Sequence, residues 1–318
     1  MERVYEGTAI QGMRSSLAQG ANAEGMEKRG PRDGRCDRPA FGGQAVIEGV
    51  MMRGPERMAI AVRRPDGEIA VHSETRIPYS RRHALLGIPV VRGAATLVDS
   101  LTAGIGALLY SANMGLGEDE QISEREAVLS IALSVVAAVA LFMVIPTLAA
   151  SFLRSRLAAS PVILNFAEGC IRLGILTLYL LAISRMKDVQ RILQYHGAEH
   201  KVINAYDRGL DLTVEAARDM SVIHPRCGTS FLLVVALVSA VLFSFFGWPG
   251  VAMRVVLRLM LLPVVAGVSY EFIRASGRSR SAVVRALALP GMWLQKLTTR
   301  EPDDGMIEVA IRAFLAAR

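Results

Sequence analysis

Residues 127–150 carry no charged side chain over 24 consecutive positions. An α-helix rises ~1.5 Å per residue, so a helix of this length can cross the ~30 Å hydrocarbon core of a bilayer. The composition agrees, because 52% of the residues are hydrophobic and the mean hydropathy is +0.35. The chain therefore predicts an α-helical integral membrane protein rather than an ordinary soluble domain.

Three further apolar segments predict additional spans, which gives four transmembrane helices within a membrane domain at 127–276: residues 162–184, 231–246 and 255–273. Lys and Arg are sparse in the connection 151–161, which has two, and frequent in the segment 185–228, which has seven. Since basic loops tend to remain on the cytoplasmic side, the pattern predicts that 185–228 and both termini are cytoplasmic.

The remaining segments divide into three parts. Residues 1–40 mix Gly, Arg, Glu and Ser without a hydrophobic period and predict a disordered extension. Residues 41–126 predict a small cytoplasmic α+β domain, with a glycine-rich strand and a β-hairpin around the turn Arg64-Pro-Asp-Gly67. Within this domain, 93–114 favour an interfacial or buried amphipathic helix over a further span. Residues 277–318 predict amphipathic helices on or near the membrane surface.

Three of the chain's five histidines fall within the polar segment 185–228. His196 and His200 are four residues apart, so on a helix they share one face and can bind one metal ion. Glu199 completes the order His-x-x-Glu-His, in which a glutamate beside the ligands activates water. A divalent metal such as zinc needs further ligands, and four nearby residues can supply them: His224, Cys227, Glu215 and Asp207.

The position of this pair depends on the helix that carries it. Residues 185–206 predict a helix that continues the second span into the cytoplasm and stops at Gly209. If that helix is straight, it carries His196 ~18 Å beyond Ser184, whereas Cys227 precedes the third span near the membrane surface. The metal site therefore forms only if the helix tilts towards the membrane or the span slides.

The third and fourth ligands decide what a metal could do. Cys227 together with three histidines would close a four-ligand shell, which is typical of a structural zinc site. An open shell would instead permit Lewis-acid activation of water, with Glu199 taking its proton. Two alternatives need no metal: a Cys227 nucleophile with His224 as its base, or a polar hairpin whose histidines only cap helices and form hydrogen bonds.

Three longer motifs occur in order along the chain: Gly42-Gly-Gln-Ala-Val-Ile-Glu-Gly-Val-Met-Met-Arg53, Tyr195-His-Gly-Ala-Glu-His-Lys201 and His224-Pro-Arg-Cys-Gly-Thr-Ser-Phe231. Together they resemble the YqhQ family of bacterial multispanning membrane proteins, which have no known function and are sometimes described as metal-dependent enzymes. The resemblance covers residues 42–296. It implies a bacterial inner-membrane protein and links the histidine segment with the glycine-rich strand, but it supplies no reaction.

Other polar residues have two interpretations each. Glu168 and Arg172 lie four apart in the second span, where they either lock two helices together or bind a lipid headgroup. Glu48 in the glycine-rich strand is either a further carboxylate for the site or an exposed residue. Asp99 is expected to lie on the solvent-exposed face of its amphipathic helix. Four arginines are expected either to bind lipid phosphates or to attach the domain to an anionic membrane surface: Arg76, Arg81, Arg82 and Arg92.

These observations lead to two hypotheses of function. The first is a metal-dependent membrane enzyme, most plausibly a hydrolase at the cytoplasmic membrane surface, with Glu199 as the catalytic residue. Its metal ligands would come from His196, His200, His224, Cys227 and Glu215. The second is a non-enzymatic scaffold or accessory protein with a structural metal or none. Membrane lipids are the expected partners, and nucleic acid is not, because the basic residues are dispersed without stacking aromatics.

Overall fold

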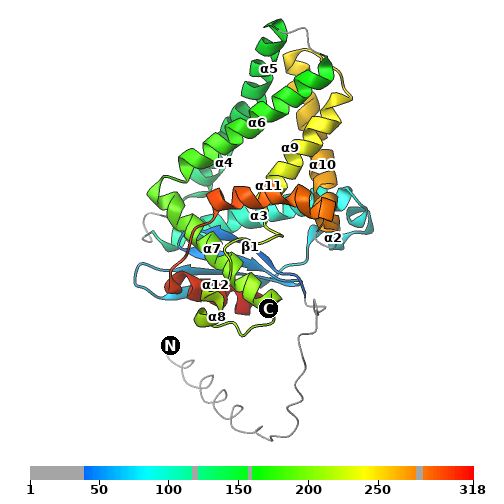
Figure 1. Ribbon diagram of the computed structural model, residues 1–318. Helices are drawn as coiled ribbons and strands as arrows, with labels where there is room; N and C mark the ends of the chain where they lie inside the picture. Colours follow the sequence, from blue (N-terminus) through cyan, green and yellow to red (C-terminus); the bar gives the residue numbers. More distant parts are fainter. Residues whose placement is uncertain (1–38, 117–120, 157–159, 277–281) are drawn as a thin grey trace, which may run out of the picture. The chain divides into compact units, whose positions relative to one another are not determined.

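The computed structural model describes residues 39–116, 121–156, 160–276 and 282–318. These residues combine a small antiparallel sheet near the N-terminus with a helical majority (Figure 1), as the predicted fold class requires. The predicted disordered extension lies outside the described residues, apart from its last two positions.

The sheet is a meander of four antiparallel strands. Its strands are β1 (Gly42–Val46), β2 (Gly49–Arg53), β3 (Arg57–Arg63) and β4 (Ile69–Thr75). The β3–β4 hairpin is the one predicted, and Gly67 in its turn has φ 89°, which glycine adopts without strain. The prediction of a single strand for the glycine-rich segment is wrong, because this segment folds as the β1–β2 hairpin with Glu48 in its turn.

One face of the sheet packs against two helices from distant parts of the chain, α7 (Lys187–Asp207) and α12 (Asp304–Ala317). Phe314 of α12 is fully buried, and its ring centroid lies 4.4 Å from that of Phe41, just before β1. The expectation that residues 277–318 lie on the membrane surface is therefore wrong for α12, which completes the core of the sheet. Amphipathicity predicts an apolar partner but does not say whether that partner is lipid or protein.

The other face of the sheet packs against α3 (Val91–Met114), which includes the buried Ala103. The two central strands are therefore buried on both faces. Asp99 of α3 is fully buried and forms ion pairs with Arg53 and Arg76. The prediction that Asp99 faces solvent is wrong, because the helix lies against the sheet and the neighbouring arginines supply the partners that a buried carboxylate needs.

Among the described residues, five helices extend away from the sheet (Figure 1): α4 (Glu124–Val139), α5 (Ile145–Arg156), α6 (Pro161–Ile183), α9 (Thr229–Ser244) and α10 (Val251–Ser276). A π-helical segment, Ala140–Val144, joins α4 to α5. The helices α3 and α11 (Ala282–Thr298) cross the base of this group, between it and the sheet. The shorter helical segments are α2 (Tyr79–Arg82), a 3₁₀ turn at Ala84–Gly87 and α8 (Val214–Arg218).

Four helical segments of the described residues are long and apolar enough to cross a membrane: Val91–Met114, Glu124–Arg156, Pro161–Ile183 and Val251–Ala275. Three of these coincide with predicted spans. The predicted span 231–246 corresponds to α9, whose apolar part, Phe231–Ser244, is shorter. The remaining long segment, Val91–Met114, is α3, which runs along the sheet across the base of the other helices (Figure 1).

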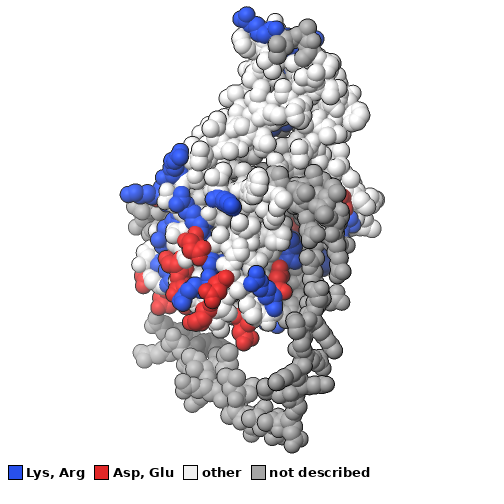
Figure 2. Space-filling view, viewed as in Figure 1, with Lys and Arg blue, Asp and Glu red and all other residues white. Residues whose placement is uncertain are grey.

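Charged side chains are unevenly distributed over the face drawn in Figure 2. They gather over the sheet, α7 and α12, where acidic and basic residues are interspersed, whereas the long helices show almost only uncharged atoms. Large apolar side chains are exposed along these helices, including Leu129, Leu133, Phe152, Phe166 and Met260. Apolar surface of this extent is compatible with contact to lipid.

Removal of the Phe314 ring tests whether α12 belongs to the core of the sheet. We expect Phe314→Ala to destabilise the protein by about 3–5 kcal/mol, because the substitution leaves a cavity between α12, α7 and the sheet. The neighbouring Leu315 is exposed, so Leu315→Ala is the matched control and should change little. Thermal unfolding in detergent measures both variants, and equal midpoints would contradict this role of α12.

Candidate metal centre

The helix that carries the histidines does not continue the second span. Helix α6 stops at Ile183, the backbone turns at Met186 (φ −74°, ψ 133°), and α7 starts at Lys187. The prediction of one continuous helix is therefore wrong. Because of this break, α7 packs against β1 instead of continuing straight from α6 (Figure 1).

Gly197 allows the chain to pack closely behind the histidines. A methyl group at this position would lie 2.0 Å from the carbonyl oxygen of Arg300, which no side chain could tolerate. The glycine of the His-Gly-Ala-Glu-His motif therefore lets the segment after α11 approach α7. That approach brings the carbonyl oxygen of Thr298 to the ring of His196.

Two backbone carbonyl groups orient the histidine rings. His196 Nδ1 lies 2.7 Å from the oxygen of Thr298, and His200 Nδ1 lies 2.5 Å from the oxygen of Val222. A carbonyl oxygen can only accept, so each Nδ1 carries the proton and each neutral ring keeps its Nε2 lone pair. Metal-binding histidines are commonly oriented in this way.

Burial keeps both rings neutral. Desolvation lowers the pKa of His196 below its ordinary value and lowers the pKa of His200 to about 3, the latter with a further contribution from the neighbouring His196. Both imidazoles are therefore unprotonated at neutral pH, which is the state that can bind a metal.

Cys227 completes a group of three candidate ligands. Its Sγ lies 3.3 Å from His196 Nε2, and one ligand atom from each of His196, His200 and Cys227 lies within 4.8 Å of the others. Burial raises the pKa of the Cys227 thiol to about 11. The thiol is thus unreactive by itself, but a bound cation would favour its deprotonated form.

His224 lies beside this group but is turned away from it. Its ring centroid is 5.8 Å from that of His200. Its Nδ1 accepts a hydrogen bond from the Arg226 amide at 3.3 Å, so the other nitrogen, 3.3 Å from Asp207 Oδ2, is the donor. Neither nitrogen of His224 is free to bind a metal. The carboxylate of Asp207 is also engaged, because it accepts from the Arg226 side chain.

Glu215, another candidate ligand, lies outside the group. It is exposed on α8, which starts after its cap Thr213, whose hydroxyl accepts from the Ala216 amide at 3.2 Å. Within the described part of the chain, the clustered ligands are therefore His196, His200 and Cys227. Three protein ligands leave a coordination position open, which is typical of catalytic rather than structural zinc sites.

Glu199 is buried on the same helix and faces the glycine-rich strand. Its carboxylate accepts a hydrogen bond from the Gly43 amide, while Oε2 has no hydrogen-bond partner. Burial raises the pKa of Glu199 to about 8, and its charge contributes to the raised pKa of Cys227. Glu199 is therefore close enough to act electrostatically on the three-ligand group.

Gly43 is a functional position that the sequence did not identify by itself. A methyl group there would lie 3.0 Å from Glu199 Cδ and 2.5 Å from the carbonyl oxygen of Met51. The absence of a side chain thus permits the contact between β1 and α7. The pair of glycines in this segment is the sequence signal that could identify such a contact, because glycines within a strand allow a ligand or another backbone to approach closely.

Gly43 also lines a cleft of about 800 Å³ that extends towards α3 and α10. Five arginines line this cleft: Arg53, Arg81, Arg92, Arg226 and Arg274. Arg53, Arg92 and Arg226 pair with the carboxylates of Asp99, Glu271 and Asp207. The side chains of Arg81 and Arg274 form no ion pair with the described residues. The cleft beside Glu199 is therefore bordered by guanidinium groups, two of which are available to a ligand.

Glu48 does not join the metal centre. It lies in the β1–β2 turn, where its carboxylate pairs with Arg191 and accepts from the hydroxyl of Tyr195 at 3.3 Å. These contacts hold the hairpin to α7. Glu48 is thus neither a further carboxylate of the metal centre nor an unpaired exposed residue. It positions the hairpin on α7.

Comparison of the sequence with known proteins shows the family to which the chain belongs. A family described as "Protein of unknown function (DUF1385)" matches residues 88–318. The chain is 34% identical over 291 residues to the "Uncharacterized protein YqhQ" of Bacillus subtilis (strain 168), covering 87% of this chain and 91% of the relative. The chain belongs to the YqhQ-like family. The resemblance inferred from the three motifs is confirmed, and the DUF1385 match contains all three clustered ligands. No solved structure matches the chain.

The raised pKa of Glu199 predicts how the metal-free protein responds to pH. Between about pH 5 and about 8, the folded protein keeps a proton on Glu199 that the unfolded chain, with an ordinary pKa of 4.5, has lost. Stability from this group therefore falls as pH rises through that window. Glu199→Gln has no titrating group at this position and should not lose stability in this way. We therefore expect its unfolding midpoint to rise relative to that of the wild type as the pH increases.

Thermal unfolding of chelator-treated protein at a series of pH values measures this difference. Glu215→Gln is the matched control, because Glu215 is exposed and its removal should leave the slope of the wild type unchanged. Parallel curves for wild type and Glu199→Gln would contradict the assigned environment of Glu199.

Proposed function

We propose that the protein is a metal-dependent hydrolase that acts at the cytoplasmic surface of a bacterial inner membrane. The observation that carries this proposal is the three-ligand group of His196, His200 and Cys227, with both rings oriented by carbonyl groups and no fourth ligand from the described residues in the group. Two nitrogens and one sulfur suit zinc, which would act as a Lewis acid at this position.

Glu199 is the proposed general base. It lies next to the ligands, is shielded from water and has one carboxylate oxygen without a partner. An unpartnered buried oxygen can accept a proton from an attacking water molecule without first breaking another hydrogen bond. A nearby cation would also favour the ionised form, which offsets the effect of burial.

The cleft beside Gly43 is the proposed substrate site. Its guanidinium groups favour an anionic substrate, and Arg81 and Arg274 are the two without carboxylate partners in the described structure. Esters and phosphoesters with an acidic group combine a hydrolysable bond with that charge. The cleft also adjoins α3 and α10, so a substrate drawn from the membrane surface could reach it.

The proposed membrane placement rests on two observations. The helices that extend from the sheet are long and apolar, and most charged side chains on the face drawn in Figure 2 lie around the sheet. We infer that the helices α4–α5, α6, α9 and α10 span the membrane while α3 lies at the interface. The distribution of Lys and Arg supports a cytoplasmic location of the sheet, the metal centre and both termini.

Metal analysis of the detergent-purified protein tests the proposed ligands. We expect near-stoichiometric divalent metal in the wild type and strong loss in His196→Ala, His200→Ala and Cys227→Ala. His224→Ala and Glu215→Ala are the controls and should retain metal, because both residues lie outside the ligand group. Metal lost equally in His224→Ala would indicate a closed structural shell instead.

Activity on chromogenic esters and phosphoesters then tests catalysis. Glu199→Gln should keep its metal and lose about 10²–10⁴-fold in kcat, since it removes the general base and leaves the ligands intact. Glu215→Gln again provides the control. If Glu199→Gln keeps full activity on a substrate that the wild type hydrolyses, the proposed role of Glu199 is wrong.

Reporter fusions test the proposed orientation. Alkaline phosphatase, which folds actively only outside the cytoplasm, should be active in the connection between α5 and α6 and inactive after Arg318. A fluorescent protein that folds in the cytoplasm should give the opposite pattern. The reverse result at both positions would contradict the orientation.

A further inference from the structure

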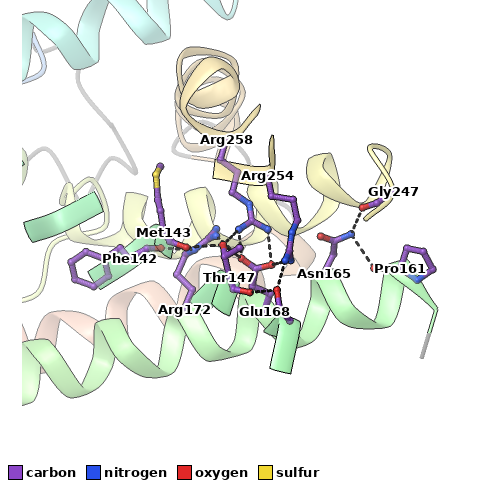
Figure 3. Close-up of polar contacts among 11 residues, drawn as sticks. Phe142, Met143, Thr147, Pro161, Asn165, Glu168, Arg172, Gly247, Arg254 and Arg258 are labelled. Atoms are coloured by element: carbon purple, nitrogen blue, oxygen red, sulfur yellow. Dashed lines mark hydrogen bonds and ion pairs between the residues drawn. The ribbon is translucent and has the colours of Figure 1, made fainter. Parts of the chain in front are cut away.

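A second polar site lies among the long helices, away from the sheet. Glu168 of α6 is buried and contacts three arginines (Figure 3). Arg258 of α10 makes the closest pair, with its Nη2 2.6 Å from Glu168 Oε2. Arg254 of α10 and Arg172 of α6 lie 3.4 Å and 3.5 Å from the same carboxylate. The predicted Glu168–Arg172 pair is thus one part of a larger arginine cluster.

The arginine cluster carries more positive than negative charge. Three guanidinium groups and one carboxylate give a net charge of +2, and no second carboxylate of the described residues contacts them. Arginine remains protonated in proteins, so the excess persists. Within helices that are otherwise apolar, such an excess is costly unless an anion balances it.

Neutral partners satisfy only part of this cluster. Thr147 and Ser151 accept from Arg258 and Arg254, and the Phe142 carbonyl oxygen accepts from Arg172 at 3.0 Å. The guanidinium of Arg254 also lies 4.0 Å from the ring centroid of Trp248. The Nε of Arg254 is nevertheless buried without a hydrogen-bond partner, so the neutral partners do not satisfy the whole cluster.

An apolar cavity of about 270 Å³ starts at the arginine cluster. Arg172, Arg258 and Phe243 line it together with apolar side chains that include Leu176, Leu232, Leu262 and Val265. From Phe243 to Leu232 the cavity follows eleven residues of α9, or ~16 Å, in the direction of the sheet. Leu232 and Leu262 are exposed, so the cavity is bordered by side chains at the surface of the helices.

The position of the arginine cluster along the helices limits what can reach it. Glu168 and Arg258 each lie seven residues, or ~10 Å, after the first residue of their helices, Pro161 and Val251. Both helices start at the end away from the sheet (Figure 1). Arg172 lies eleven residues, or ~16 Å, after Pro161, in the middle of α6. The charged part of the cavity therefore lies between that end and the middle of the helices, and its apolar part extends from there towards the sheet.

We propose that this cavity binds an anionic phospholipid, with its phosphate at the arginine cluster and one acyl chain along the apolar wall. Guanidinium groups match phosphate in charge and in hydrogen-bond geometry. A charged part in the half of the helices away from the sheet and an apolar path from there towards the sheet share the direction of a lipid in the leaflet far from the sheet. The site is separate from the metal centre and does not depend on the proposed hydrolase activity.

Lipid-dependent thermal stability of the detergent-purified full chain tests this site, with phosphatidylglycerol as the anionic probe and phosphatidylcholine as the zwitterionic one. The wild type should be stabilised by phosphatidylglycerol alone. Arg172→Gln should weaken the apparent affinity by about tenfold or more, since it removes a charged hydrogen-bond donor but leaves the closer pair of Glu168 with Arg258. Arg156→Gln, at an exposed arginine of α5, is the matched control and should bind like the wild type.

A second variant separates the charge from the cavity. Leu176→Trp fills the apolar wall without changing any charge and should also weaken phosphatidylglycerol binding, even where Arg172→Gln proves too unstable to measure. Inorganic phosphate, added as a further arm, should not reproduce the stabilisation. The proposal is overturned if Leu176→Trp binds phosphatidylglycerol like the wild type, or if inorganic phosphate stabilises equally, since either result would leave no role for the acyl chain.

Discussion

The close contact between Gly43 and Glu199 is the constraint on which the arrangement of the metal centre depends. It brings an edge strand of the sheet against the face of α7 that carries the histidines. A larger residue at position 43 would collide with both the carboxylate and the neighbouring strand. Burial raises the pKa of Glu199, and the hydrogen bond from the Gly43 amide partly opposes this shift. One missing side chain links the two most distinctive motifs of the chain.

The ligand group is built from elements that are far apart in the sequence. His196 is oriented by Thr298, about a hundred residues later, and His200 by Val222 in the loop before α9. That loop is in turn fixed by Gln295 of α11, whose side chain both donates to and accepts from the backbone of His224. The rings are therefore held by tertiary packing, and the break after α6 is what allows α7 to reach these partners.

Local patterns predicted the parts of the fold that depend on neighbouring residues. Apolar segments of sufficient length predicted three of the long helices, turn residues predicted the β3–β4 hairpin, and helical spacing paired His196 with His200. What failed required knowledge of the partner surface: Asp99 is buried because arginines surround it, and α12 covers the sheet instead of lipid. The different fates of His224 and Cys227 also could not follow from spacing, since both stand in one motif and only tertiary contacts distinguish them.

The two candidate sites, the metal centre with its cleft and the arginine cluster, lie towards opposite ends of the long helices. Helix α10 contributes Arg254 and Arg258 near its start and Arg274, beside the cleft, near its end. At the cleft, three of the five arginines pair with carboxylates, and the buried Glu199 nearby has one oxygen without a hydrogen-bond partner. In the arginine cluster the imbalance is positive charge in apolar surroundings. The partners proposed for the two sites are therefore opposite in charge: a cation at the three-ligand group and an anion at the arginine cluster.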